Sequence, residues 1–337
     1  MENPVETIIT NVRGTEHVLE AASRHDKPTL VASTSEVYGK INGNYGNDGT
    51  TGGLREDSDW QLGPTSRRRW AYACSKAMDE FLSLAYFEEK RLPVIVTRFF
   101  NTVGPRQTGT YGMVVPRFVE KALLNEPIVV HGDGEQTRCF NHVADCVSAV
   151  AALMHASGAC GRVFNIGNDE EITMNSLALR VCELADSTSE VVHVPYDTVY
   201  PHGFEDMRRR TPDLSLIRSM IDCAPQHGID SIISDVVDYY RHGDIAGWSR
   251  AHQEIGNSFG GWKWPWGTHL IVLCRPSPQY RIAGQAECRG IQQSGDRLAV
   301  SDLTQLDHSD RAGEPHRLDI QKFIELQAAL CFRQPGR

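Results

Sequence analysis

The sequence lacks the features that mark disulfide-rich, zinc-binding and membrane proteins. Its nine cysteines are odd in number and scattered, and none forms a Cys-x-x-Cys pair, which argues against a disulfide framework and a zinc site. No apolar run approaches the length that crosses a bilayer, and the first residues have no apolar stretch typical of a secretion signal. We therefore expect a cytoplasmic protein without a bound metal and without a membrane partner.

An excess of positive charge is also lacking. Lys and Arg total 34 against 43 Asp and Glu, so the formal net charge is -9. Proteins that bind nucleic acids in general need clustered cations to neutralise phosphates. The only tight basic runs are the arginine triplets at 67–69 and 208–210, for which an exposed surface is the alternative interpretation. We expect no nucleic-acid partner, and phosphate recognition only at local sites.

What is present is an alternation of helical and strand-like segments over the first 245 residues. With 337 residues and 40% hydrophobic content, the chain is long enough for roughly two domains. Segment 40–66 is rich in Gly, Asn, Asp and Ser and is predicted to be a loop. Helices that alternate with apolar strands are typical of a doubly wound parallel sheet. The predicted helices are 6–24, 73–91, 115–124, 143–156, 174–185 and 228–241, and the predicted strands are 28–33, 94–100, 128–131 and 162–166.

The last quarter of the chain differs in character. Beyond about residue 248, tryptophans at 262, 264 and 266 precede a stretch without sustained hydrophobic periodicity. We predict that this tail, 249–337, contributes little to the main core and is the least ordered part.

A spacing that matches a dinucleotide-binding turn occurs at Gly43, Gly46 and Gly49. We reject it, because that turn functions only between a buried strand and a helix, and this copy lies in a polar loop.

Hydroxyls and a carboxylate follow the first predicted strand. Ser33, Thr34, Ser35 and Glu36 stand at its carboxyl end, where open α/β sheets bind ligands. The alternative is that these hydroxyls only cap the next turn.

Tyr72 and Lys76 lie four residues apart, hence on one helix face. There the ammonium can stabilise a phenolate and lower the tyrosine pKa, so that Tyr72 becomes a candidate general base. Tyr86 and Lys90 repeat the spacing on the same helix. Fourteen residues separate the two tyrosines, roughly 21 Å at about 1.5 Å per residue. Only Tyr72 is therefore expected to meet Thr34, and Tyr86 is interpreted as packing.

Taken in order, five segments resemble the extended short-chain dehydrogenase/reductases, and within them the nucleotide-sugar epimerases, dehydratases and decarboxylases. They are 33–39 (STSEVYG), 72–76 (YACSK), 98–106 (RFFNTVGPR), 132–140 (GDGEQTRCF) and 165–168 (NIGN). The resemblance runs from residue 1 to about 245. It implies an α/β fold with an incomplete Rossmann-type doubly wound parallel sheet, NAD as cofactor and a homodimer.

The resemblance also implies a domain organisation. A truncated NAD-binding domain with the catalytic residues would span 1–170, and a smaller α/β substrate-binding region would span 171–248. The tail at 249–337 matches nothing in the family pattern.

By this resemblance Tyr72 removes the proton of the sugar C4 hydroxyl, Lys76 lowers the Tyr72 pKa, and Thr34 hydrogen-bonds the substrate. Glu36 and Ser35 belong to the same catalytic group. Two further sets follow from the motif positions. The residues that contact the cofactor would be Ser33, Tyr72, Lys76 and Phe99, and those that hold the nucleotide diphosphate would be Asn101, Arg106, Arg138 and Arg210, since guanidinium groups pair well with phosphate oxygens.

The family pattern opens with a strand, a Gly-rich turn and an acidic residue, none of which precedes Met1. We therefore expect weak NAD binding and slow or absent turnover by this chain.

Several functions stay open. We expect a UDP-sugar 4-epimerase first. A UDP-glucuronate decarboxylase ranks close behind, because Arg210 resembles the decarboxylase arginine, and a sugar-nucleotide 4,6-dehydratase follows. The non-enzyme alternative is a fragment that only binds nucleotide sugar or self-associates.

Overall fold

The computed structural model describes residues 4–40, 52–107, 109, 113–199, 207–222, 224–242 and 272–274. The glycines at 43, 46 and 49 lie outside these residues, as does the tail at 249–337 apart from one strand. The predictions made for them therefore stay predictions.

Every predicted helix and strand is present, and most ends fall within one or two residues of the expected ones. The helices are α1 (Pro4–Arg24), α2 (Arg69–Lys90), α3 (Val114–Leu123), α4 (Val143–His155), α5 (Met174–Leu184), α6 (Tyr196–Val199), α7 (Ser215–Met220) and α8 (Ile229–His242), with a 3₁₀ turn η1 (Ser35–Tyr38). The strands are β1 (Thr29–Thr34), β2 (Val94–Phe99), β3 (Thr102–Val103), β4 (Ile128–His131), β5 (Thr137–Cys139), β6 (Asn141–His142), β7 (Arg162–Ile166), β8 (Glu171–Thr173), β9 (Val191–Val194), β10 (Arg209–Arg210) and β11 (Val272–Cys274).

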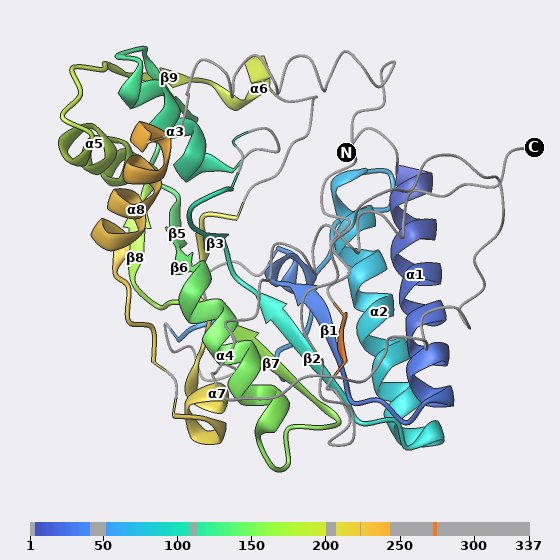
Figure 1. Ribbon diagram of the computed structural model, residues 1–337. Coiled ribbons are helices and arrows are strands. Elements are labelled where there is room, and N and C mark those ends of the chain that lie inside the picture. Colours follow the sequence, from blue (N-terminus) through green and yellow to red (C-terminus); the bar gives the residue numbers. More distant parts are fainter. Residues whose placement is uncertain are drawn as a thin grey trace, which may run out of the picture. The chain divides into compact units, whose positions relative to one another are not determined.

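The main sheet has the strand order β11-β1-β2-β7 (Figure 1). β1, β2 and β7 run parallel, with Thr34 opposite Phe99 and Phe99 opposite Ile166 at their carboxyl ends. β11 pairs antiparallel with β1. The predicted parallel sheet is thus confirmed, and one short segment of the tail adds a strand beside β1.

Helices cover both faces of this sheet, as expected for a doubly wound fold (Figure 1). Successive side chains of a strand point to opposite faces, so alternate residues of β1 and β2 belong to different cores. Val31, Val94 and Val96 pack with Leu19 of α1 on one face. Leu30 and Ile95 pack on the other face with residues of α4, β7 and α7, among them Leu153, Phe164 and Ile217.

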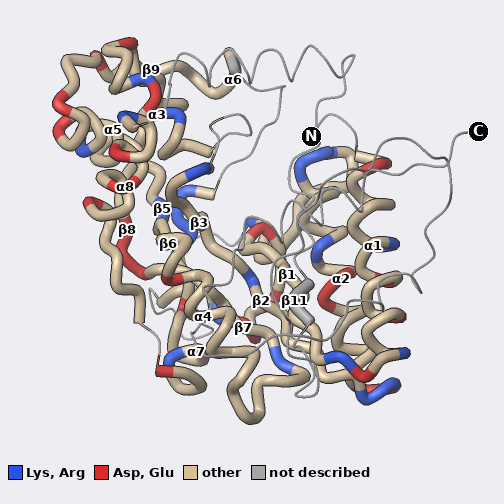
Figure 2. The backbone as a smooth tube through the Cα atoms, in the orientation of Figure 1, with Lys and Arg blue, Asp and Glu red and all other residues tan. Residues whose placement is uncertain are grey.

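A second core gathers α3, α5 and α8 around β4. Its buried residues include Val119 of α3, Leu177 of α5 and Val236 of α8. These residues come from both sides of position 170, where the first predicted domain ends. The segment 114–130 contributes to this core before the chain returns to the main sheet in β7. The acidic residues of α5, α8 and β8 gather on this region in Figure 2.

One face of α2 is charged although it is buried against the sheet. Arg98 of β2 donates to both carboxylate oxygens of Glu80, and its closest contact there is 2.8 Å. Ser33 of β1 donates to the same carboxylate. Both charged side chains are 3% exposed. The Arg98 guanidinium also lies 4.7 Å from the ring centre of Tyr38. This ion pair joins α2 to two strands at their carboxyl ends.

We predict that Arg98→Ala lowers the free energy of unfolding by about 3–5 kcal/mol, because it leaves the Glu80 carboxylate buried without its counter-ion. Denaturant unfolding measures the change. The matched control is Arg24→Ala, since Arg24 and Glu20 form an exposed pair at 3.4 Å that contributes at most about 1 kcal/mol. Equal losses in the two variants would contradict the structural role given to Arg98.

Candidate active site

The carboxyl end of β1 turns directly into η1 and presents the predicted hydroxyls. Thr34 caps this turn, with its Oγ1 accepting a hydrogen bond from the Glu36 amide at 3.2 Å. Ser35 is buried, and Ser33 is engaged with Glu80. The capping alternative therefore describes part of the role of Thr34, while its side chain stays accessible to a neighbour on α2.

That neighbour is Tyr72, in the first turn of α2. Its hydroxyl faces the Thr34 side chain, which favours the phenolate. Burial, with added repulsion from Glu36 and Asp79, raises the Tyr72 pKa to about 12. The sequence predicts a lowered pKa, so the surroundings in this structure act in the opposite direction. The role of Tyr72 as a base stays a prediction.

Lys76 lies one turn further along α2, but its ammonium contacts a carboxylate. Its Nζ donates to Asp79 Oδ2 at 2.7 Å, and the side chains are 2% and 0% exposed. The structure thus brings Thr34 and Tyr72 together and directs Lys76 to Asp79. Tyr86 lies beside α1, facing Glu16 and Glu20, and packs against the core there. The interpretation of Tyr86 as a packing residue is confirmed.

Glu36 is the anionic centre of the site. Its carboxylate pairs with Arg210 of β10, and Arg69 of α2 donates to it at 3.4 Å. Burial alone would raise the Glu36 pKa, but Arg210 and Arg69, with a smaller contribution from Arg138, hold that pKa at about 2. Glu36 is therefore ionised at neutral pH, and its charge opposes formation of a phenolate at Tyr72.

Two of the predicted phosphate-binding residues extend this group. Asn101 accepts from Arg210 at 3.3 Å and donates to the main-chain oxygen of Cys139 at 2.8 Å. Its φ of 23° is rare outside glycine but less so for asparagine, and it turns the chain after β2 towards the site. Arg138 of β5 stands opposite Arg210 in the parallel pair β5 and β10.

The Arg138 guanidinium is nearly buried and donates to main-chain oxygens, 2.7 Å from Thr137 and 2.8 Å from Met207. Arg106 and Phe99 are the remaining predicted residues. Arg106 is exposed in the turn after β3, and Phe99 packs against the core on the α4 side of the sheet.

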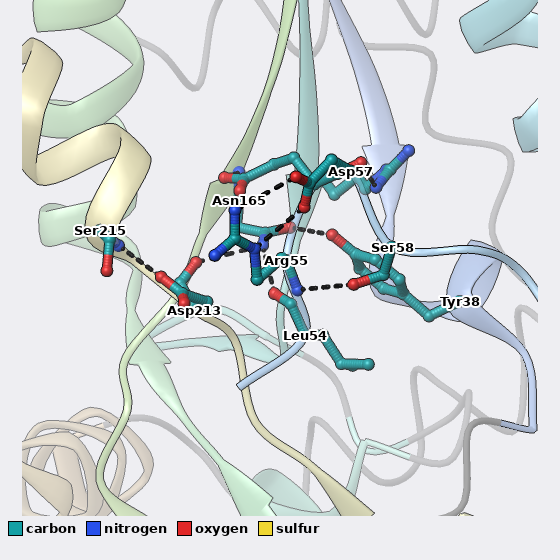
Figure 3. A network of polar contacts seen from close by, with 10 residues as sticks. Tyr38, Leu54, Arg55, Asp57, Ser58, Asn165, Asp213 and Ser215 are labelled. Atoms are coloured by element: carbon teal, nitrogen blue, oxygen red, sulfur yellow. Dashed lines mark hydrogen bonds and ion pairs between the residues drawn. The ribbon is translucent and has the colours of Figure 1, made fainter. Parts of the chain in front are cut away.

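Asn165, the first residue of segment 165–168, lies within a network of polar contacts with Tyr38, Leu54 and Asp213 (Figure 3). Asn165 is fully buried, and its amide accepts from Tyr38 at 2.8 Å and donates to the main-chain oxygens of Leu54 and Asp213 at 2.8 and 3.2 Å. Its own main-chain N–H donates to Glu56 at 2.8 Å. These bonds tie the end of β7 to η1 and to the loop segment 54–58, so this Asn has a structural role.

Three residues of the site were not singled out by the sequence. Arg69 was seen only as part of a basic run, and Asp79 and Glu80 were not considered. Arg69 could have been found from its place in the arginine triplet 67–69. Arg69 and Arg210 are the third arginines of their triplets, and both contact Glu36. The first two arginines of the first triplet, at 67 and 68, are exposed.

Two findings on metal ligands and on helices hold for the residues that the structure describes. Nowhere in those ranges do three or more His, Cys, Asp or Glu side chains gather in a way that could hold a metal ion. Among the described helices, none combines the length and apolar character that a membrane span requires.

We predict that Glu36→Gln lowers the free energy of unfolding at neutral pH by about 2 kcal/mol, since a carboxylate whose pKa is lowered by folding stabilises the folded state above its unfolded pKa. As pH falls from about 4.5 to about 2, Glu36 is protonated and the difference between parent and variant disappears. Paired denaturant titrations across this range measure it.

The control is Asp57→Asn, which breaks an exposed pair with Arg55 and should change stability by less than about 1 kcal/mol at any pH. A constant difference between parent and Glu36→Gln across the range would show that Glu36 is not held as an anion.

Comparison with known proteins gives a family, related sequences and similar folds. Residues 1–167 match the model of the NAD dependent epimerase/dehydratase family. The chain is 39% identical over 242 residues to UDP-N-acetyl-alpha-D-glucosaminuronate decarboxylase of Bacillus cytotoxicus. This match covers 72% of each of the two chains. It is 34% identical over 237 residues to UDP-glucuronic acid decarboxylase 1 of Arabidopsis thaliana, covering 69% of this chain and 51% of that relative.

Among solved structures, dTDP-glucose 4,6-dehydratase of Bacillus anthracis in complex with NAD superposes with a TM-score of 0.60 at 28% identity, over 71% of this chain and 70% of that one. The chain thus spans about half the length of the Arabidopsis relative and about 70% of the other two. The resemblance in the ordered motifs is therefore confirmed, and the chain belongs to the NAD-dependent epimerase/dehydratase family.

Proposed function

We propose that this chain carries the site for NAD-dependent decarboxylation of a UDP-linked uronic acid. The observation that carries the proposal is the arrangement around Glu36, where two guanidinium groups meet a carboxylate beside the Tyr72–Thr34 pair. A site that holds a carboxylate between arginines suits a substrate that brings an acid group of its own.

The relatives favour this reaction over the one that the sequence ranked first. The relatives reported above are decarboxylases of UDP-linked uronic acids. Solved 4-epimerases such as UDP-glucuronic acid 4-epimerase of Bacillus cereus share the fold at 23% identity. The family as a whole does not single out 4-epimerisation, so we place decarboxylation first and keep the epimer as an outcome of the test.

The chemistry follows from a ketone at C4 of the sugar. Tyr72, with Thr34 orienting the substrate hydroxyl, would take the C4 hydroxyl proton. The C4 carbonyl then lies β to the C6 carboxylate, so the C5–C6 bond can break with release of carbon dioxide, and the electron pair is held as an enolate until C5 is protonated. When bound, NAD supplies the acceptor, and later the donor, of the hydride at C4.

The described residues fit the nicotinamide end of that cofactor. Tyr72, Thr34 and Lys76 are brought to the carboxyl edge of parallel strands, where α/β sheets bind dinucleotides. The Lys76 ammonium has three donors, of which Asp79 takes one. Lys76 and Tyr72 would hold the nicotinamide ribose, with Ser33 and Phe99 as the other cofactor candidates.

A homodimer through α1 and α2 stays part of the proposal. These helices expose apolar side chains, among them Ile9 of α1 and Met78 and Phe81 of α2, and Phe81 is 62% exposed.

We predict that the purified chain, with NAD in excess because the chain is expected to bind it weakly, slowly releases carbon dioxide from UDP-glucuronate or UDP-N-acetylglucosaminuronate and leaves UDP-glucose unchanged. Carbon dioxide release and nuclear magnetic resonance of the sugar product measure both reactions. A product that keeps its carboxylate and differs only at C4 would favour the epimerase. Conversion of neither acid would contradict the proposal.

We further predict that Tyr72→Phe lowers kcat by about 10²–10⁴-fold, the usual contribution of a positioned general base. Tyr86→Phe is the matched control, because Tyr86 lies on the same helix away from Thr34. Equal effects of the two substitutions would show that Tyr72 is not the base.

A further inference from the structure

The buried pair of Lys76 and Asp79 has no part in the proposed chemistry as described so far. Both residues lie on the inner face of α2, and Asp79 is fully buried although it carries a carboxylate. Isolating one charge in the protein interior is costly, so each charge holds the other in place. Thr15 of α1 is buried as well, and its side chain favours the ionised form of Asp79. The ammonium is thus held on the inner face of α2, one turn from Tyr72.

Other charged groups near Tyr72 and Lys76 already have strong partners. From α2, Glu80 pairs with Arg98 of β2. From η1, Glu36 pairs with Arg210 of β10 and Arg69 of α2.

From α1, the facing side chains are neutral. Asn11 donates to Ser75 Oγ at 2.9 Å, and Thr7 and Thr15 are buried beside it. Among the described carboxylates, Asp79 is thus the counter-ion of Lys76. Its removal would leave the pairs Arg98–Glu80 and Arg210–Glu36 intact.

We propose that Asp79 is a positioning residue that anchors and neutralises the Lys76 ammonium, and thereby controls how readily Tyr72 gives up its proton. The proposal rests on the proposed role of Tyr72 as the base. Asp79 itself need not touch substrate, since it acts through Lys76 and through its own charge.

The physical consequence has a definite sign. An anion near a phenol disfavours the phenolate, and an unneutralised cation favours it. Asp79 is among the groups that raise the Tyr72 pKa, after burial and Glu36. Asp79→Asn keeps the size and polarity of the side chain but removes the anion. Both effects then lower the Tyr72 pKa from about 12, by roughly one pH unit at the effective dielectric constant of a protein.

The test is ultraviolet titration of tyrosinate in the full chain. The signal of Tyr72 is isolated as the difference between each protein and the same protein with Tyr72→Phe, while circular dichroism confirms that the fold is kept. We expect Tyr72 to ionise at a pH roughly one unit lower in Asp79→Asn than in the parent. The acid limb of the pH profile of kcat/KM, measured with UDP-glucuronate, should move by the same amount.

Glu88→Gln is the matched control. It removes one carboxylate from the exposed far end of the same helix, sixteen residues or roughly 24 Å from Tyr72, and should leave the titration unchanged. Asp79→Ser is the second neutral variant. Failure of both neutral variants to fold would make Asp79 a structural residue, and the proposal would be wrong.

An unchanged or raised ionisation pH in Asp79→Asn would also overturn it. Because the titration needs neither substrate nor turnover, its result stands apart from that of the decarboxylation assay.

Discussion

The site depends on the orientation of α2, which is fixed by charges buried against the sheet. Arg98 reaches from β2 to Glu80, and Ser33 of β1 donates to the same carboxylate. Because residues four apart share a helix face, this pairing also directs Lys76 and Tyr72 inward. Tyr72 thus lies at the end of β1, where it meets Thr34. Loss of the buried pair would remove one of the contacts that hold this face of α2 against the strand ends.

The electrostatics of the site oppose the ionisation of Tyr72 that the proposed reaction requires. Tyr72 contacts Thr34, yet the Glu36 carboxylate and burial keep it protonated. Glu36 itself is held as an anion by Arg69 and Arg210. A substrate with an acid group would compete with Glu36 for these two guanidinium groups. The proposed decarboxylation would remove that added negative charge from the site. Its product would then be repelled less by the anionic Glu36 than the substrate is.

Much of the frame could be predicted from the sequence, because the apolar strands are continuous and bounded by breakers such as Pro93. β2 and β7 were placed to within one residue. The short strands β5 and β10 were missed, since segments of two or three residues carry no periodicity and their pairing is set by tertiary contacts. The partner of Lys76 was equally hidden: Tyr72 and Asp79 both stand within one turn of it, and only coordinates show which one the ammonium contacts.

The central claim is that the substrate passes through a ketone at C4 and returns to an alcohol in the same site. The most direct measurement uses UDP-glucuronate with deuterium at C4, incubated with the chain and NAD, and locates the label in the product by mass spectrometry and nuclear magnetic resonance. The account predicts a pentose product with carbon dioxide released and deuterium retained at C4. Loss of deuterium from C4 would contradict it. Where hydride transfer limits turnover, equal rates for the labelled and unlabelled substrates would also contradict it.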